Sequence, residues 1–176
     1  MSAKKRILLL GSVASGKTAL ARKLSQALLL PIVHVDQIEF NSDLSKKNID
    51  LIRSEIKTAV DRPEWILDGH GPLDLLPAHL KNADVVIYID LPLWRNIVWL
   101  VKRQLKVLFK PRSEMPAGAQ EWSWPHFKKM YLTLEKQHRL MNPELSRILN
   151  RPENQSKLVH IKTLNQLREA VGKVST

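Results

Sequence analysis

The stretch that decides the fold is Gly11-Ser12-Val13-Ala14-Ser15-Gly16-Lys17-Thr18. Before it, Arg6-Ile7-Leu8-Leu9-Leu10 is a short, largely apolar run, which is typical of a strand buried on both faces of a parallel sheet. After it, apolar residues recur at steps of three and four from Ala19 to Leu28, as they do in an amphipathic helix. The sequence therefore predicts a strand, a glycine-bounded turn and a helix, in that order.

The turn, residues 11–18, is called the phosphate loop below, because Gly-x-x-x-x-Gly-Lys-Thr between a strand and a helix is typical of a cradle for nucleotide phosphates. Successive backbone N–H groups of the turn and the positive end of the helix dipole would bind the phosphates. Gly11 and Gly16 would allow the backbone to come close to them. Lys17 is expected to reach the β- and γ-phosphates and the Thr18 hydroxyl to ligate Mg²⁺. A chance glycine turn that caps a helix is the alternative, and the flanking elements argue against it.

Composition is ordinary for one domain: 176 residues, 44% hydrophobic and 26% charged. The absence of cysteine excludes disulfides and thiolate metal sites. Neither a signal peptide nor a membrane span is visible, so we expect a cytoplasmic location and no membrane partner. The net charge of +11 is unevenly spread: residues 1–90 hold 12 Lys/Arg and 11 Asp/Glu (+1), and residues 91–176 hold 16 and 6 (+10). The positive electrostatic field of the second half could attract nucleic acid or a phosphorylated small molecule, or it could only keep the protein soluble.

Two aspartates are predicted to follow strands. Asp36 ends the run 31–36, and Asp68 ends Trp65-Ile66-Leu67-Asp68. Ligands of open α/β sheets bind beyond the carboxyl ends of the strands, so both side chains are expected at the edge that carries the phosphate loop. We assign Asp68 to the Mg²⁺ shell and Asp36 to the acceptor, as a general base. The alternative for Asp36 is a helix cap or a solvated surface residue, and the alternative for Asp68 is a simple Asp-Gly turn.

Further strands are predicted over 85–90 and 157–161, and helices over 49–60 and 165–174, the latter capped at Thr163. A helix after Pro92 carries an apolar stripe, which we interpret as core packing. The residues of this stripe are Trp94, Ile97, Val98, Val101, Leu105 and Leu108. Another helical stretch, 125–150, is expected to break at Asn142-Pro143.

A basic, aperiodic segment lies in the second half. The helix after Pro92 ends among Lys102, Arg103, Lys106, Lys110 and Arg112, which could close over a triphosphate or meet a nucleic-acid backbone. Residues 110–125 then change to Pro, Gly, Ser and Trp, and a loop of this length is typical of a lid. Its Trp122 and Trp124 could stack on a base or pack the lid onto its own helices.

The whole chain resembles the adenylate-kinase-like branch of the P-loop kinases, and most closely the bacterial proteins labelled DNA topology modulation proteins. The resemblance rests on the phosphate loop and on a set of short motifs: His34-Val35-Asp36 with Phe40, Trp65-Ile66-Leu67-Asp68-Gly69, Asp90-Leu91-Pro92, and Arg112 through Met115, Gly118, Glu121 and Phe127. It implies a single three-layer α/β/α P-loop NTPase domain over 1–176, with a five-stranded parallel sheet in the order 2-3-1-4-5 and a helical or loop lid over 103–127.

The same resemblance implies ATP, Mg²⁺ and phosphoryl transfer to a small acceptor. Arg103 corresponds to a first lid arginine, and Arg112 or Arg139 to a second. Two departures are visible: Ala14 stands where glycine is common, and Asp68-Gly69-His70-Gly71-Pro72 lacks the Phe-Pro-Arg with which adenylate kinases hold a monophosphate acceptor. The resemblance therefore does not extend to AMP as the acceptor.

Three functions follow from these observations. The favoured one is an ATP-dependent kinase for a small acceptor. The second is an ATP-binding regulator that docks on DNA or RNA through its basic half, although no groove-reading motif is present. The third is a simple ATPase without an acceptor.

Overall fold

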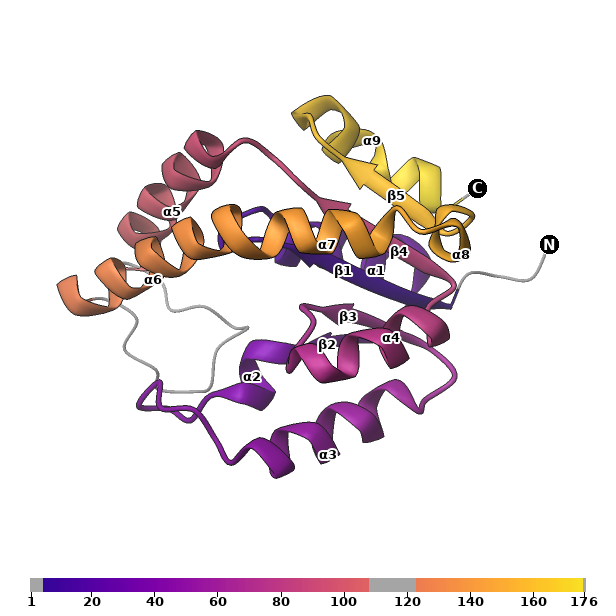
Figure 1. Ribbon diagram of the computed structural model, residues 1–176, viewed down its shortest axis with the longest axis horizontal. Helices are drawn as coiled ribbons and strands as arrows, with labels where there is room; N and C mark the ends of the chain where they lie inside the picture. The colour runs from indigo at the N-terminus through magenta and orange to yellow at the C-terminus, as the bar shows by residue number, and fades with distance from the viewer. Residues whose placement is uncertain (1–4, 108–122, 176) are drawn as a thin grey trace.

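The computed structural model describes residues 5–107 and 123–175. These residues form a parallel sheet of five strands in the order β2-β3-β1-β4-β5, which confirms the predicted order (Figure 1). The strands are β1 (Arg6–Gly11), β2 (Ile32–His34), β3 (Trp65–Asp68), β4 (Val85–Ile89) and β5 (Leu158–Ile161). Because β1 is central, the phosphate loop that follows it begins in the middle of the carboxyl edge of the sheet.

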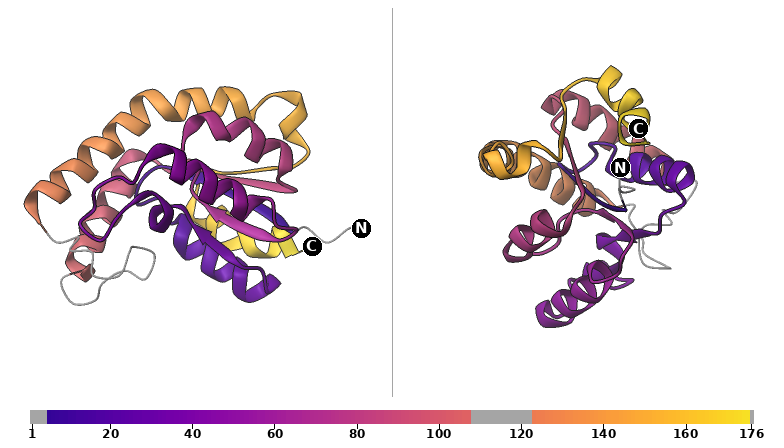
Figure 2. Two further views of the ribbon diagram at one scale, coloured as in Figure 1. Left: turned by 90° about the horizontal axis from the view of Figure 1, so that it is seen from below. Right: turned by 90° about the vertical axis from the view of Figure 1, so that its right-hand side faces the viewer.

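The core has two layers because side chains alternate along each strand. In β1, Leu8 and Leu10 join one buried cluster, and Ile7 and Leu9 join the other. Helices α3 (Ile49–Val60), α4 (Leu76–Asn82) and α7 (Asn142–Leu149) cover the first cluster, while α1 (Lys17–Leu28) and α9 (Leu164–Ser175) cover the second. The two views of Figure 2 show this arrangement of helices on both sides of the sheet, which is the predicted three-layer fold.

The remaining elements lie mostly around the site. Helices α5 (Leu93–Val107) and α6 (Trp124–Lys136) pack against each other beyond the carboxyl ends of the strands (Figure 1). The short elements are α2 (Val35–Glu39), the 3₁₀ turn η1 (Leu73–Leu75), the π turn η2 (Gln137–Met141) and α8 (Pro152–Gln155). The predicted cap of the last helix is confirmed, since Thr163 Oγ1 accepts the Gln166 N–H at 3.3 Å.

The apolar stripe of α5 does not face the core as expected. Trp94, Val98, Val101 and Leu105 are 41–57% exposed, whereas the buried residues of α5 are Asn96, Leu100 and Gln104. The reason is that α5 packs against α6 and the phosphate loop instead of lying flat on the sheet. Periodicity located the helix correctly but assigned its inner face to the wrong residues. Of the stripe, Leu108 lies outside the described residues.

The expected break at Asn142-Pro143 is also wrong. Helix α6 continues through η2 directly into α7, so that one long helical segment crosses the molecule (Figure 1). In a π turn each N–H bonds to the carbonyl five residues earlier, which adds a residue to the turn without ending the helix. Pro143 follows at the start of α7, where a proline is tolerated.

The predicted lid over 103–127 begins in the last turn of α5 and ends in the first turn of α6. Its central part, residues 108–122, lies outside the described residues, and Arg112 and Trp122 lie there. Trp124 is described: it is 75% exposed and stacks on Phe127, with ring centroids 5.6 Å apart. Within the described ranges, every helix falls short of the length or the hydropathy of a membrane span.

Candidate active site

The phosphate loop has the backbone of a tight cradle. Gly11 has a φ of +147°, and a Cβ there would lie 2.6 Å from the carbonyl oxygen of Ile89 in β4. Gly16 caps α1 with a φ of +93°, and a Cβ would lie 3.0 Å from the ring of Trp99. Both positions therefore require glycine on steric grounds. The turn ends at the first residue of α1, so the free N–H groups of this helix point into the cradle.

Side chains of the phosphate loop are arranged for a phosphate. Lys17 Nζ donates to the carbonyl oxygens of Gly11 and Ser12, at 2.8 Å each, and is thus held over the turn. Ser15 Oγ is buried and has no hydrogen-bond partner among the described residues. Ala14 adopts a φ of +55°, a left-handed conformation that is costly for a residue with a Cβ. The loop therefore fits the phosphates of a nucleotide: its glycines leave room for them, and the Ser15 hydroxyl and the Lys17 ammonium lie beside that space.

Asp68 lies at the centre of a small hydrogen-bond network. Its Oδ2 atom accepts from Thr18 Oγ1 at 2.7 Å and lies 3.1 Å from His34 Nδ1. The side chain is 6% exposed. Burial raises the pKa of Asp68, but the hydrogen bond from His34, the charge of Lys17 and the hydrogen bond from Thr18 outweigh burial and hold the pKa below its usual value. The carboxylate is therefore ionised at neutral pH.

The network fits Mg²⁺ better than a metal held by protein ligands alone. The described residues contain no group of three His, Cys, Asp or Glu side chains placed to hold a metal. Mg²⁺ is commonly bound through one or two side chains, substrate phosphates and water. Because Thr18 donates its proton to Asp68, the lone pairs of its hydroxyl are available to a cation. Thr18 and Asp68 are therefore suited to this ion.

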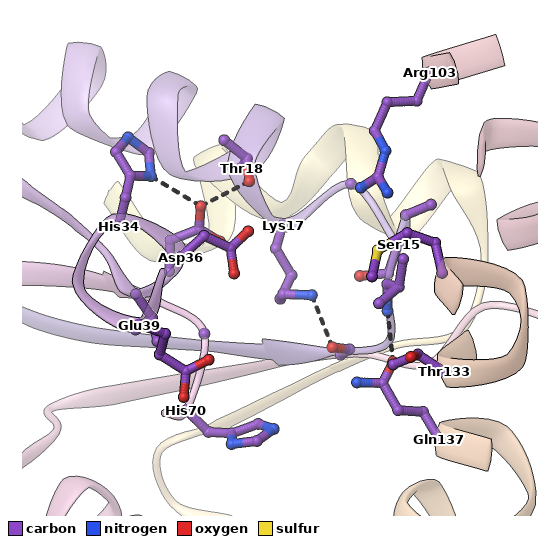
Figure 3. Close-up of a pocket in the computed structure, with 18 of the residues that line it drawn as sticks. Ser15, Lys17, Thr18, His34, Asp36, Glu39, His70, Arg103, Thr133 and Gln137 are labelled. Atoms are coloured by element: carbon purple, nitrogen blue, oxygen red, sulfur yellow. Dashed lines mark hydrogen bonds and ion pairs between the residues drawn. The ribbon is translucent and has the colours of Figure 1, made fainter. Parts of the chain in front are cut away.

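Asp36 lies in α2 and not at the end of a strand as expected. Strand β2 ends at His34, and α2 begins at once, with the Phe40 N–H bonded to the Asp36 carbonyl oxygen at 3.2 Å. An acidic residue in the first turn is stabilised by the helix dipole, which favours this early start. Asp36 still lines the cavity beside the phosphate loop, together with Glu39 and His70 (Figure 3).

The cavity between these elements has a volume of about 400 Å³. The phosphate loop forms its floor, and α2 with the turn after Asp68 forms one wall. The opposite wall consists of α5 and α6. On that wall the lining residues are Trp99, Arg103, His126, Lys129, Met130, Thr133 and Gln137.

Only one of the three predicted arginines is seen at this cavity. Arg103 lines it from α5 (Figure 3). Arg139 does not line it; its side chain is 74% exposed and pairs with Glu135, one helical turn away, at 3.4 Å. Arg112 lies outside the described residues. Of two nearby histidines, His70 lines the cavity, whereas His79 in α4 is buried.

The π turn brings two amides of the long helical segment onto the phosphate loop. Gln137 Oε1 accepts the Val13 N–H at 2.8 Å, and Asn142 Oδ1 accepts from Ser12 Oγ at 3.1 Å. In an α-helix, residues five apart point in different directions, but the i to i+5 pattern of a π turn places them on one side. This local geometry lets a single helical segment hold the loop at two consecutive residues.

Asn142 also links the phosphate loop to the neighbouring strands. Its Nδ2 donates to Asp90 Oδ1 at 3.5 Å, and its carbonyl oxygen accepts from Tyr88 OH at 3.4 Å. His160 Nε2 lies 3.2 Å from Asp90 Oδ2. Burial raises the pKa of Tyr88 to about 12, so its hydroxyl stays a donor at neutral pH. A buried polar network of this kind fixes the position of the loop.

The sequence analysis missed several residues of the site, and some left a signal. His126, Met130, Thr133 and Gln137 recur at steps of three and four in α6, which would have indicated one helix face. Trp99 precedes Arg103 by one helical turn and shares its face. Glu39 left no signal, since its place depends on α2 starting at Val35. The partners of Asn142 and Gln137 depend on the π turn, which sequence patterns do not reveal.

Comparison with known proteins identifies the fold. Neither protein-family models nor curated protein sequences match the chain. Among solved structures, it is similar to a shikimate kinase from Acinetobacter baumannii in complex with shikimate, with a TM-score of 0.56 and 14% identity over 97% of this chain and 90% of that one. It is also similar to a gluconokinase from Sinorhizobium meliloti 1021, with a TM-score of 0.54 and 13% identity over 98% and 90%. The chain thus has the P-loop kinase fold of these two structures.

Proposed function

We propose that the protein is an ATP-dependent, Mg²⁺-assisted kinase that phosphorylates a hydroxyl group of a small acceptor. The observation that carries this proposal is the Thr18–Asp68–His34 network beside the phosphate loop, with Asp36 on the α2 wall of the same cavity. The fold shared with a shikimate kinase and a gluconokinase supports it. From the sequence motifs, we further infer a relationship to the bacterial DNA topology modulation proteins, and we favour a small acceptor over DNA as the partner.

The residues of the cavity have different roles in the proposed phosphoryl transfer. The N–H groups of the phosphate loop and Lys17 bind the phosphates, and Lys17 exchanges its two carbonyl partners for phosphate oxygens. Thr18 and Asp68 would hold Mg²⁺, which would neutralise phosphate charge there. Arg103 and Lys129 approach from the opposite wall and can stabilise charge on the transferred group.

Asp36 is placed to act on the acceptor. It accepts the hydroxyl proton while the acceptor oxygen forms its bond to the γ-phosphorus and the bond to the departing ADP oxygen breaks. His34 does not need to touch the substrate. Its hydrogen bond orients the Asp68 carboxylate, so we assign it a positioning role.

The test is ADP release measured with ATP, Mg²⁺ and a panel of nucleosides, sugars, polyols and hydroxy acids. We expect release that requires Mg²⁺, rises with the correct acceptor and disappears in Lys17→Ala. The matched control is Lys23→Ala, because Lys23 is an exposed lysine of the same helix outside the cavity. Mass spectrometry should find the phosphorylated acceptor.

Other outcomes separate the remaining functions. ADP release that no acceptor increases would indicate a simple ATPase. ATP binding without turnover for any acceptor would contradict the kinase proposal. In that case, binding to DNA or RNA that weakens steeply with salt would favour the regulator.

A further inference from the structure

The two walls of the cavity carry opposite charges. Arg103 and Lys129 lie on the α5–α6 wall, and Asp36 and Glu39 lie on the α2 wall. Figure 3 shows Arg103 on one side of Lys17, and Asp36 and Glu39 on the other. Because a triphosphate needs cations, the α5–α6 wall belongs to the ATP side. The α2 wall is left for the acceptor.

Glu39 makes the acceptor wall unusual. It is the last residue of α2, its side chain is only 14% exposed, and it follows Asp36 by three residues, which puts both on one helix face. Its ion-pair partner is Lys46, at 3.5 Å, whose own side chain is 57% exposed. Burial raises the pKa of Glu39; the charge of Lys46 lowers it and that of Asp36 raises it, and the net shift is upward. Lys46 therefore compensates the negative charge of Glu39 only in part.

Among the described residues, the α2 wall offers no lysine or arginine to an anionic acceptor. Among the described lining residues, Lys and Arg occur at Lys17 in the phosphate loop and at Arg103 and Lys129 on the other wall. The lining residues of α2 and of the turn after Asp68 include neither lysine nor arginine. A phosphate or carboxylate on the acceptor would thus face two carboxylates in a partly buried cavity, where like charges repel strongly.

We propose that the acceptor is an alcohol without an anionic group, and that an ammonium or a second hydroxyl of this acceptor donates to Glu39 while the reacting hydroxyl faces Asp36. This inference rests on the proposed kinase function and narrows its substrate class. Glu39 then acts as a specificity residue. The alternative is a purely structural role for Glu39. Its ion pair with Lys46 would then stabilise the segment after α2, where the Lys47 N–H also donates to the Glu39 carbonyl oxygen.

The experiment compares acceptors that differ in charge: adenosine with AMP, glycerol with glycerate, and glucosamine with glucose and gluconate. We expect the uncharged or cationic member of a phosphorylated pair to have a kcat/KM at least tenfold above the anionic one. Glu39→Gln should raise the acceptor KM about tenfold and leave the ATP KM within twofold. Glu55→Gln is the matched control, since Glu55 pairs with Lys47 at 3.9 Å and lies outside the cavity.

The outcomes are distinct. Preferred phosphorylation of AMP, glycerate or gluconate would overturn this inference and leave the kinase function intact. An unchanged acceptor KM and unchanged preference in Glu39→Gln would support the structural reading and overturn the role of Glu39. The comparison of acceptors uses the wild-type protein, so it holds even if a Glu39 variant does not fold. ATP binding with no acceptor phosphorylated would contradict the kinase function, and this inference with it.

Discussion

Replacing Asp68 with asparagine tests the centre of the site by two independent measurements. Asparagine keeps the shape of the side chain and removes the charge, so it resembles the protonated aspartic acid. In the native protein, the Thr18 and His34 contacts and the charge of Lys17 favour the ionised form, which holds the pKa of Asp68 below its usual value. The variant should therefore be less stable at neutral pH even without nucleotide or metal.

The expected loss follows from the contacts. Hydrogen bonds to a charged group contribute roughly 1.5–3 kcal/mol, and part of this remains with an amide, so we expect Asp68→Asn to cost about 2 kcal/mol. For a chain of this length that corresponds to a decrease in Tm of about 4–8 °C. Since the folded pKa is depressed, the contribution of Asp68 is complete above the unfolded pKa of about 3.9 and is lost as pH falls through the folded pKa.

The assay is urea unfolding in EDTA at pH 7, 4 and 3, for wild-type protein, Asp68→Asn and the control Asp61→Asn, which changes an exposed carboxylate at the end of α3. The stability gap should be largest at pH 7, shrink below pH 4 and be absent in the control. The network as described would be refuted by equal stability at pH 7, or by a gap that persists unchanged at pH 3.

The activity of Asp68→Asn gives the second measurement. Removing one preorganised electrostatic contact typically lowers kcat by roughly 10²–10³, and we expect this range for kcat with a much smaller change in the ATP KM. Thr18→Ala should act on the same unit, so the double variant should lose much less than the product of the two single losses. Additive losses would indicate that the two residues act separately.

Three further predictions concern other parts of the chain. Leu29 at the end of α1 is 88% exposed and has a φ of +57°, a conformation that glycine adopts without strain. Leu29→Gly is therefore expected to stabilise the protein by about 0.5–1 kcal/mol in thermal unfolding. Ala27→Gly inside α1 should destabilise it by about the same amount. Asn142→Ala should lower the unfolding free energy by about 1–3 kcal/mol, because it leaves buried polar groups without partners. Arg103→Ala should lower kcat at least about tenfold, while Arg139→Ala should stay within about twofold of wild type, as measured by ADP release.

The fold was predictable because its signals are local. Each strand is a short apolar run, and the phosphate loop marks the first turn from strand to helix, so the order of elements follows from the chain itself. The inner face of α5 was not predictable in this way. Its apolar stripe, from Trp94 to Leu105, is exposed, and Asn96 and Gln104 are buried, because the position of α5 depends on α6. Periodicity reports a helix face but not the neighbour that covers it.

The candidate site, too, was predictable from the sequence only in part. Thr18 and Asp68 were assigned together from the sequence, since both follow strands that end at one edge, and their 2.7 Å hydrogen bond agrees with a shared role. The place of Glu39 and the bond from the Val13 N–H to Gln137 could not be assigned. They depend on where α2 begins and on the π turn between α6 and α7, and both are settled by packing between segments far apart in the chain.

Part of the uneven charge of the chain lies at the cavity. Four of the six acidic residues of the second half pair with nearby cations, in Glu135–Arg139, Glu144–Arg147, Glu153–Arg151 and Glu169–Lys173, and the other two lie outside the described residues. The cations of α5 and α6 include Arg103 and Lys129, which face the phosphate loop across the cavity. A triphosphate held between these helices and Lys17 would meet positive charge on both sides, while the acceptor meets Asp36 and Glu39. Under the proposed kinase function, the nucleotide is therefore the anion that Arg103 and Lys129 suit.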